Sequence, residues 1–274
     1  MKSVKEILKK KLRAKELALV PSSFDLVGDI LIFADFPDAL KKQKLVAESF
    51  LDFYKNIKVI CKKTKKYSGT FRTPRLKILA GEKRKETIHR ENNCAFRLNV
   101  ETCYFSPRLG HERKRIAQLV KSGEKILVMF SGVAPYPLTI ARNSKAKLVC
   151  AIEKNPKAHK YAEDNIRLNK VSNVRLFRGD VKSVLPKMKL AFDRVIMPLP
   201  KGAETFLEIA LPKVKRNGTL HFYDFQGEDD FSEAAQKIFA ACKKAKKKCK
   251  ILGIVKCGQY SPRVFRVCVD VKVF

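Results

Sequence analysis

The sequence predicts an α/β fold: a Rossmann-like parallel sheet that ends in an antiparallel hairpin and is preceded by a small α/β domain. Three observations predict it. Short apolar runs alternate with helical segments from residue 125 onward, the last two runs are separated by a few residues, and a basic polar stretch precedes the series. The chain has 274 residues, 45% of them hydrophobic, which suffices for a core of ordinary size.

The first part of the chain supplies the small domain. Its expected elements are a basic amphipathic helix (4–19), a strand with a glycine kink (25–33), a helix (38–54), a second strand (57–61) and an exposed basic hairpin (62–93). We therefore expect an N-terminal basic helix over 1–21 and a small α/β domain that faces a ligand over 22–98.

The remainder, 99–274, supplies the large domain. Its expected strands are 126–130, 148–153, 174–178, 194–197, 219–224, 251–256 and 264–273, and its expected helices are 136–144, 156–168, 202–214 and 231–247. This alternation favours a parallel sheet covered by helices on both faces. The link Cys257–Arg263 is too short for a crossover helix, so the last two strands must pair antiparallel. A parallel sheet ending in this way is typical of class I methyltransferases.

Charge is the dominant feature of the composition. Lys and Arg total 59 against 27 acidic residues, which gives a formal net charge of +32. So much like charge repels itself unless it meets a polyanion, and phosphate neutralisation with counterion release favours nucleic acid. The alternative is a lysine-biased proteome whose charges lie on solvated faces.

Several classes of protein are excluded. No apolar run approaches the roughly 20 residues of a membrane-spanning helix, and the N-terminus lacks the apolar stretch of a secretory signal. The 8 cysteines form no Cys-x-x-Cys pair, so we expect no metal site. Cys103, Cys150 and Cys268 lie in apolar runs as small hydrophobic residues. We expect a monomeric, cytoplasmic protein without a membrane partner.

Ligands of doubly wound sheets bind at the carboxyl ends of the strands. The first such end reads FSGVAPYPL, where Ser131, Gly132 and Ala134 allow a backbone turn close to a ligand. Glu153 ends the second strand, about 20 residues beyond Gly132, the spacing of an acid that accepts ribose hydroxyls. Its alternative role is to cap the helix that begins at Pro156.

Three further segments carry candidate residues. Asp180 ends the third strand and is suited either to accept an adenine amino group or to cap the helix expected over 181–186. MPLPK (197–201) follows the fourth strand as a stiff loop. YFSPRLGHERKR (104–115) brings aromatic, cationic and acidic groups into one turn that enters a helix, and its alternative is a solvated turn with salt bridges.

These motifs resemble a known family. YFSPRLGHER, FSGVAPYPL, AIEKNPKAHKYAEDNIRLNKV, GDV, DRVIMPLPK and YSPR resemble the archaeal and eukaryotic tRNA guanosine-37 N1-methyltransferases and their sisters, which transfer aminocarboxypropyl in wybutosine synthesis. The resemblance runs from about residue 22 to 274. It implies S-adenosylmethionine as cofactor and tRNA, near the anticodon stem-loop, as partner.

The resemblance also implies roles for single residues. Glu112 resembles the base that removes the guanine N1 proton, Arg72 the cation that stabilises charge on O6, and Tyr104 a residue that shapes the pocket. Arg108 and Pro198 resemble further residues of the catalytic site. The implied cofactor contacts are Ser106, Arg113, Phe130, Gly132, Val133, Glu153, Lys154, Asp180, Val181 and Pro198.

Two features favour methyl transfer over the sister activity, the run Ser106-Pro107-Arg108-Leu109 and the second proline of the MPLP loop. Aminocarboxypropyl transfer is the first alternative. A catalytically inactive RNA-binding protein is the second, suggested by Val128, Ala134 and Pro198, where many relatives carry aspartate, glycine and asparagine. The separate N-terminal domain with which some members check the tRNA elbow is expected to be absent.

Overall fold

The protein divides into two compact units. The structure is a computed structural model that describes residues 3–274, with the side chains of 66–68 outside the description. The first unit comprises residues 1–90 and 95–107, and the second unit comprises residues 91–94 and 108–274. Each unit has its own hydrophobic core.

The first unit contains a four-stranded sheet in the order β1-β2-β3-β4, formed by β1 (Phe24–Val27), β2 (Ile30–Phe33), β3 (Val59–Ser68) and β4 (Thr73–Gly81). The expected single strand over 25–33 was wrong, because β1 and β2 form an antiparallel hairpin. Gly28 turns the chain at φ +57°, and a Cβ there would lie 2.2 Å from the Thr87 hydroxyl. Only glycine fits this turn.

Helices pack against this sheet and close the core of the first unit. The expected N-terminal helix is two short ones, α1 (Val4–Lys9) and α2 (Ala14–Ala18), and α3 (Gln43–Phe53) joins β2 to the parallel β3. Leu8 of α1 and Phe50 of α3 are buried in one cluster with Phe33. β5 (Glu86–Glu91) and β6 (Cys94–Asn99) form a separate two-stranded sheet.

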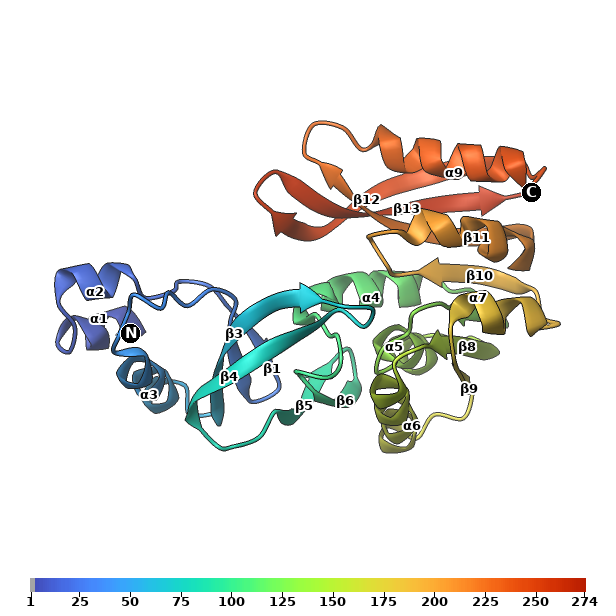
Figure 1. Cartoon of the computed structure of the whole chain (residues 1–274). Coiled ribbons are helices and arrows are strands. Elements are labelled where there is room, and N and C mark those ends of the chain that lie inside the picture. The colour runs from blue at the N-terminus through green and yellow to red at the C-terminus, as the bar shows by residue number, and fades with distance from the viewer. Residues whose placement is uncertain (1–2) are drawn as a thin grey trace. The chain divides into compact units, whose positions relative to one another are not determined.

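The second unit is built on a seven-stranded sheet in the order β12-β13-β11-β10-β7-β8-β9 (Figure 1). Its strands are β7 (Lys125–Val128), β8 (Leu148–Glu153), β9 (Val174–Arg178), β10 (Phe192–Met197), β11 (Val214–Gly227), β12 (Cys249–Ser261) and β13 (Val264–Val273). β11, β10, β7, β8 and β9 are parallel, while β13 pairs antiparallel with both β11 and β12. The predicted fold class, with its closing hairpin, is confirmed.

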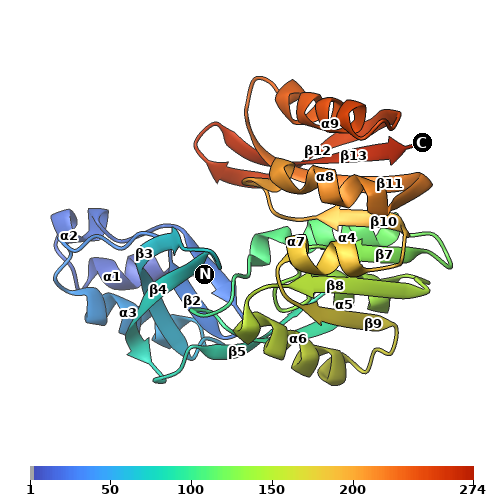
Figure 2. The ribbon, with the colours of Figure 1, turned by 45° about the vertical axis from the view of Figure 1, so that its right-hand side comes forward.

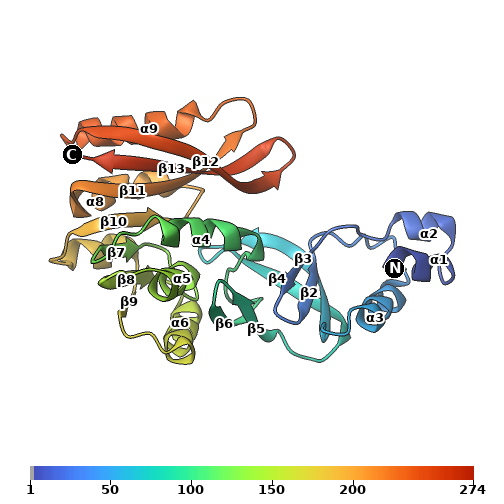
Figure 3. The same ribbon diagram turned by 180° about the vertical axis from the view of Figure 1, so that it is seen from behind.

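Helices cover both faces of this sheet. Residues of α4 (Gly110–Gln118) and α5 (Pro135–Asn143) pack with α6 (Pro156–Asn169) on one face, which Figure 3 shows from that side. α7 (Val181–Val184), α8 (Leu207–Ala210) and α9 (Ser232–Lys244) pack on the other (Figure 2). No helix within residues 3–274 is long and apolar enough to cross a bilayer.

One expected helix of the second unit was wrong. Residues 202–214 form three short turns, η3 (Ala203–Phe206), α8 and η4 (Leu211–Lys213). The other short 3-10 helices are η1 (Pro107–Leu109) and η2 (Leu185–Lys187). Pro212 has no backbone N–H and stands in the first turn of η4, so a single α-helix cannot continue through it.

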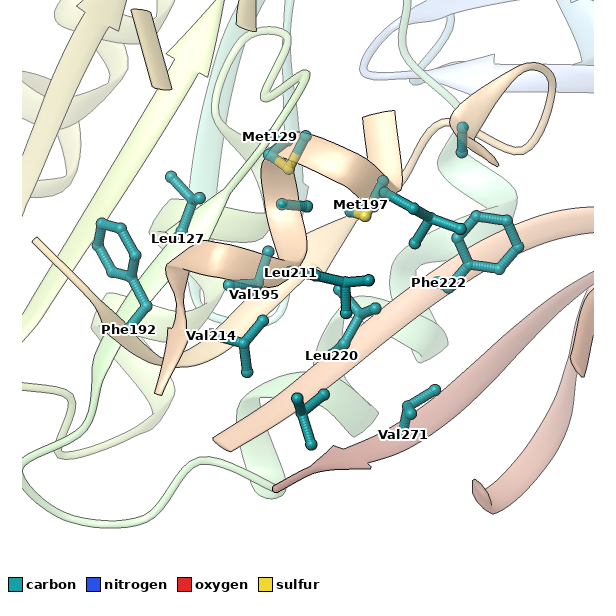
Figure 4. Packing of buried hydrophobic residues seen from close by; sticks show 14 of the residues in the cluster. Leu127, Met129, Phe192, Val195, Met197, Leu211, Val214, Leu220, Phe222 and Val271 are labelled. Carbon is teal, nitrogen blue, oxygen red and sulfur yellow. The ribbon is translucent and has the colours of Figure 1, made fainter. Parts of the chain in front are cut away.

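Apolar side chains fill the space between the sheet and α7–α9 (Figure 4). Leu127, Val195 and Leu220 come from three neighbouring parallel strands and are all 0% exposed. A sheet buried on both faces requires such continuous apolar runs, which is why the sequence revealed these strands. The packed core holds the strand ends, and hence the loops that follow them, in fixed positions.

All eight cysteines are free thiols, and seven are buried. Burial raises the pKa of Cys61, Cys94 and Cys150 to about 11, so these thiols stay protonated and act as small apolar groups. Cys268 was expected to act as a small apolar residue, but its thiol also donates to the Asp270 carboxylate at 3.3 Å.

Candidate active site

The loop after β7 lies where the carboxyl ends of the parallel strands meet. Phe130, Gly132 and Ala134 have φ of +55°, +57° and +68°, so the backbone turns repeatedly through the left-handed region. The Ser131 N–H donates to the Ile152 carbonyl of β8 at 2.9 Å and fixes the loop to the sheet. The Ser131 hydroxyl is buried and has no hydrogen-bond partner among the described residues.

Glu153, at the end of β8, holds two of these loops together. Its carboxylate accepts from the Gly132 N–H at 2.6 Å and from the Asn155 N–H at 2.6 Å. Burial raises the pKa of Glu153, and the two backbone hydrogen bonds oppose that shift. Asn155, not Glu153, caps α6, since the Asn155 side chain accepts from the N–H groups of Lys157 and Ala158.

Asp180 ends the β9 loop and caps a helix. Its carboxylate accepts from the Lys182 N–H at 2.9 Å and pairs with the Lys154 ammonium at 2.9 Å. The Lys154 contact and the backbone hydrogen bond lower the pKa of Asp180. Val181, the first residue of α7, is 3% exposed. The capping role is therefore present, and Lys154 and Asp180, both expected cofactor contacts, form an ion pair.

Two aromatic rings lie beside the β7 loop. Phe130 contacts Phe206 edge to face, with ring centroids 4.8 Å apart, and the Lys182 ammonium lies 5.2 Å from the centre of the Phe206 ring. Val133 is fully buried. Pro198 follows β10, the strand next to β7, and is half-buried in the proline-stiffened loop.

The chemistry of this edge fits a nucleoside. Glu153 offers a carboxylate that can accept ribose hydroxyls, and the Ser131 hydroxyl is a buried group in need of a partner. Glu153 ends β8 and Ser131 lies in the loop after β7, so both are at the carboxyl edge of a doubly wound sheet, where such ligands bind. The residues present therefore fit the nucleoside part of S-adenosylmethionine.

Glu112, the candidate base, lies inside the second unit. It is 0% exposed, on the buried face of α4. One carboxylate oxygen accepts from Arg115 at 2.8 Å and from the Tyr223 hydroxyl at 2.5 Å, and the other accepts from Arg115 at 2.7 Å. The Tyr136 hydroxyl donates to Tyr223 at 3.1 Å. Sequence reasoning named Glu112 as a candidate but did not predict these partners.

Arg113, an expected cofactor contact, forms a buried ion pair. Its guanidinium is 2% exposed and donates to both oxygens of Glu91 at 2.5 and 2.7 Å. A Cβ at Gly110 would lie 2.9 Å from the Glu91 carboxylate, so a larger residue there would displace this side chain. Arg113 is held firmly on α4 by this pair.

The other expected residues are distributed as follows. Arg72, in the first unit, lies in the turn between β3 and β4 with φ +50°. Tyr104 and Ser106, also in the first unit, follow β6 and are half-buried. Arg108 is exposed in η1, in the second unit. The left-handed φ of Arg72 costs energy for a residue with a Cβ, and such strain is concentrated at functional sites.

Comparison with known proteins places this geometry in a family. The TRM5/TYW2 methyltransferase domain matches residues 87–252, and the TYW2 N-terminal domain matches residues 4–84. The chain belongs to the TRM5/TYW2 family. The resemblance read from the sequence motifs is thereby confirmed.

Relatives within the TRM5/TYW2 family differ in activity. The tRNA (guanine(37)-N(1))-methyltransferase Trm5b of Pyrococcus abyssi is 39% identical over 93% of this chain and 76% of its own, and its crystal structure superposes with a TM-score of 0.86 at 37% identity, over 96% and 78% of the two chains. The tRNA(Phe) (4-demethylwyosine(37)-C(7)) aminocarboxypropyltransferase of Methanocaldococcus jannaschii is 33% identical over 91% and 97%. The structure of P. horikoshii TYW2 in complex with MeSAdo has a TM-score of 0.83 at 27% identity, over 99% and 98%.

TRM5/TYW2 proteins use S-adenosylmethionine, so the expected cofactor is confirmed. Which residues of this chain contact it stays a prediction that mutagenesis can test. We expect Glu153→Ala to weaken S-adenosylmethionine binding measured by calorimetry, because the variant loses the acceptor for ribose hydroxyls. In the parent, affinity should fall as pH drops through the raised pKa of Glu153, since only the ionised carboxylate accepts both hydroxyls. An unaltered affinity in the variant would leave Glu153 only its role in joining the two loops.

Proposed function

We propose that this chain transfers a methyl group from S-adenosylmethionine to N1 of guanosine 37 in tRNA, beside the anticodon. The observation that carries the proposal is the higher identity to the P. abyssi N1-methyltransferase, 39%, than to the M. jannaschii aminocarboxypropyltransferase, 33%. The run Ser106-Pro107-Arg108-Leu109 and the two prolines of the MPLP loop support it from the sequence side.

Methyl transfer to guanine N1 requires a base. Neutral guanine carries a proton on N1, and the nitrogen becomes a good nucleophile only when that proton leaves. A positioned carboxylate that accepts the proton contributes roughly 10²–10⁴-fold to such a reaction. Glu112 is our candidate, because it is a carboxylate held beside the carboxyl edge of the sheet by Arg115 and Tyr223.

The same step requires a cation. Loss of the N1 proton leaves negative charge on the guanine O6, and a positioned donor there lowers the barrier. Arg72 is our candidate, because it lies in the turn between β3 and β4 and its backbone has a strained left-handed φ. Tyr104 shapes the pocket for the base in this proposal, with Arg108 and Pro198 as further members of the catalytic site.

Cofactor binding is assigned to the loops at the sheet edge. S-adenosylmethionine, when bound, supplies a methyl group activated by the neighbouring sulfonium. In this proposal Glu153 accepts the ribose hydroxyls and Asp180 accepts the adenine amino group. The further contacts are assigned to Ser106, Arg113, Phe130, Gly132, Val133, Lys154, Val181 and Pro198.

Positive charge is the chain's contribution to tRNA affinity. The net charge of +32 neutralises phosphates and releases their counterions, a term that does not depend on sequence. Recognition of the anticodon stem-loop by this charge is part of the proposal, and it makes tRNA affinity steeply dependent on salt.

Aminocarboxypropyl transfer is the second candidate. The observation favouring it is the match of residues 4–84 to the TYW2 N-terminal domain. The two activities differ in which carbon of the sulfonium the base attacks, so the same cofactor site serves both. A methyltransferase acting on 4-demethylwyosine at position 37 is also among the relatives, from Saccharolobus solfataricus at 36% identity over 78% of this chain and 83% of its own.

One experiment separates these activities. The purified protein is incubated with isotopically labelled S-adenosylmethionine and either unmodified tRNA or tRNA carrying 4-demethylwyosine, and the nucleosides are analysed by mass spectrometry. N1-methylguanosine on unmodified tRNA is the expected product. A base bearing the heavier amino acid group would favour the second candidate. Binding of tRNA without any cofactor binding by calorimetry would mean that the chain is a non-catalytic RNA-binding protein.

A further inference from the structure

The candidate base shares its main partner with a second carboxylate. The Arg115 guanidinium binds Glu112 through Nε and Nη2, and it binds Asp270 of β13 through Nη1 at 2.6 Å and Nη2 at 3.3 Å. The Asp270 side chain is 12% exposed and the Glu112 side chain 1%. One cation therefore binds two buried carboxylates, and one of them, Asp270, is 155 residues from Arg115 along the chain.

Asp270 has a second partner besides Arg115, the buried His221. His221 of β11 stands directly opposite Asp270 in the antiparallel register, and its Nδ1 lies 2.6 Å from the carboxylate. The His221 Nε2 lies 2.5 Å from a guanidinium nitrogen of Arg194. Because arginine can only donate, Nε2 accepts, and the ring proton must be on Nδ1, where it donates to Asp270. His221 is thus a neutral ring in a fixed tautomer.

The contacts continue from His221 through Arg194 to the half-buried Glu124. Arg194 donates to Glu124 at 2.9 Å and to the Leu119 carbonyl at 2.7 Å. His221 and Arg115 hold the pKa of Asp270 well below its usual range, so this carboxylate stays ionised. The resulting chain of polar contacts, buried at its centre, comprises Glu124, Arg194, His221, Asp270, Arg115 and Glu112.

A metal ion does not explain this cluster. His221, Cys268 and Asp270 offer ligand atoms within 4.8 Å of one another. The Nε2 of His221 and the carboxylate of Asp270 are however taken by the guanidinium groups of Arg194 and Arg115. Two fixed positive charges at these distances repel a cation, and the same atoms are satisfied as hydrogen-bond partners.

The buried position of Glu112 sets a requirement on its proposed role. A base must come within hydrogen-bond reach of the proton that it removes, directly or through one water. To act as the base, the Glu112 carboxylate therefore has to break its hydrogen bonds with the Tyr223 hydroxyl and with Nη2 of Arg115. The Arg115 side chain is 24% exposed, and leaving this half-buried guanidinium without a carboxylate would be unfavourable, whereas a guanidinium that keeps Asp270 stays paired.

We propose that Asp270 and Tyr223 are positioning residues for Glu112 with opposite effects. Asp270 keeps Arg115 paired when the Glu112 carboxylate turns to the substrate, and Tyr223 holds the carboxylate in its inward position between turnovers. This inference rests on the proposed role of Glu112 as base. His221 and Arg194 act one step further back, by fixing the orientation of Asp270.

The test is the single-turnover rate of transfer at saturating S-adenosylmethionine and saturating unmodified tRNA. We expect Asp270→Asn to slow this rate about 10- to 100-fold, the loss that a misplaced catalytic group produces. We expect Tyr223→Phe to change the rate in the opposite direction, because the variant loses the hydroxyl that holds the Glu112 carboxylate inward. Asp193→Asn removes a carboxylate of the same sheet that is paired to Lys215; it is the matched control and should leave the rate unaltered.

A merely structural role would give different results. An unchanged rate in folded Asp270→Asn would overturn the proposal, as would a change in the same direction in both variants. If Asp270→Asn does not fold, as melting curves would show, Tyr223→Phe decides: a faster rate supports the proposal, and a slower or unchanged rate overturns it. In a Glu112→Gln background, Asp270→Asn should cause no further loss, because it acts through Glu112.

The design separates this inference from the proposed function. Full activity of Glu112→Gln alone would remove Glu112 as base, and the inference would fall with it. Loss of activity in Glu112→Gln with parental behaviour of both Asp270→Asn and Tyr223→Phe would sink the inference and leave the proposed function standing.

Discussion

Glu112→Gln is expected to collapse the chemical step of methyl transfer while leaving tRNA and S-adenosylmethionine affinity close to the parent. The amide keeps the volume of the side chain but cannot accept the guanine N1 proton, and the loss should be about 10²–10⁴-fold. The measurement is the single-turnover rate with excess enzyme, which excludes product release. Calorimetry on the same preparation gives the cofactor affinity.

The variant needs a control because Glu112 is buried. Its amide would place a donor against Arg115 or Tyr223, which lowers the free energy of unfolding as well as the rate. A melting curve therefore accompanies the kinetics. Glu163→Gln makes the same chemical change at an exposed position of α6, where Glu163 pairs with His159, and should leave the rate unaltered. Parental single-turnover rates in Glu112→Gln would exclude this residue as the base.

The sequence was sufficient for the sheet of the second unit, because strands buried on both faces are necessarily continuous apolar runs. Placing the strands also places their carboxyl ends, and therefore predicts that Glu153 and Asp180 lie at that edge of the sheet. The broken helix at Pro212 and the hairpin at Gly28 were missed for local reasons. Pro212 ends its helix because it has no backbone N–H, and Gly28 ends its strand because it adopts a left-handed φ. The apolar pattern alone would continue both elements.

The partners of Glu112 could not be predicted in the same way. Arg115 stands three residues from Glu112 on one helix face, a spacing visible in the sequence. Asp270 and His221 meet only because β13 inserts antiparallel between β11 and β12 in one particular register. A shift of β13 by one residue would turn Asp270 to the opposite face, away from His221. The available signal was a histidine and an aspartate inside otherwise apolar strands, where burial without a partner would be costly.

Arg72→Ala is expected to slow the chemical step by ~2–4 kcal/mol, the cost of removing one preorganised donor from a developing oxyanion. The residue lies in a tight turn, its N–H donating to the Gly69 carbonyl at 3.2 Å. Alanine bears the same left-handed backbone angle at similar cost, so the turn should be kept. Arg72→Lys retains the charge without the planar fork of donors and should recover part of the loss.

Arg75→Ala distinguishes this role from simple attraction of tRNA. Arg75 is an exposed cation on β4 of the same hairpin, so its removal changes the net charge equally. Both variants should weaken tRNA binding and reduce its salt dependence to a similar degree. At saturating tRNA the Arg75 variant should regain the parental single-turnover rate, whereas the Arg72 variant should stay slow at every tRNA concentration, because charge on O6 develops only after binding. Recovery of both variants at high tRNA would make Arg72 a phosphate contact, and the cation for O6 would then have to be another residue.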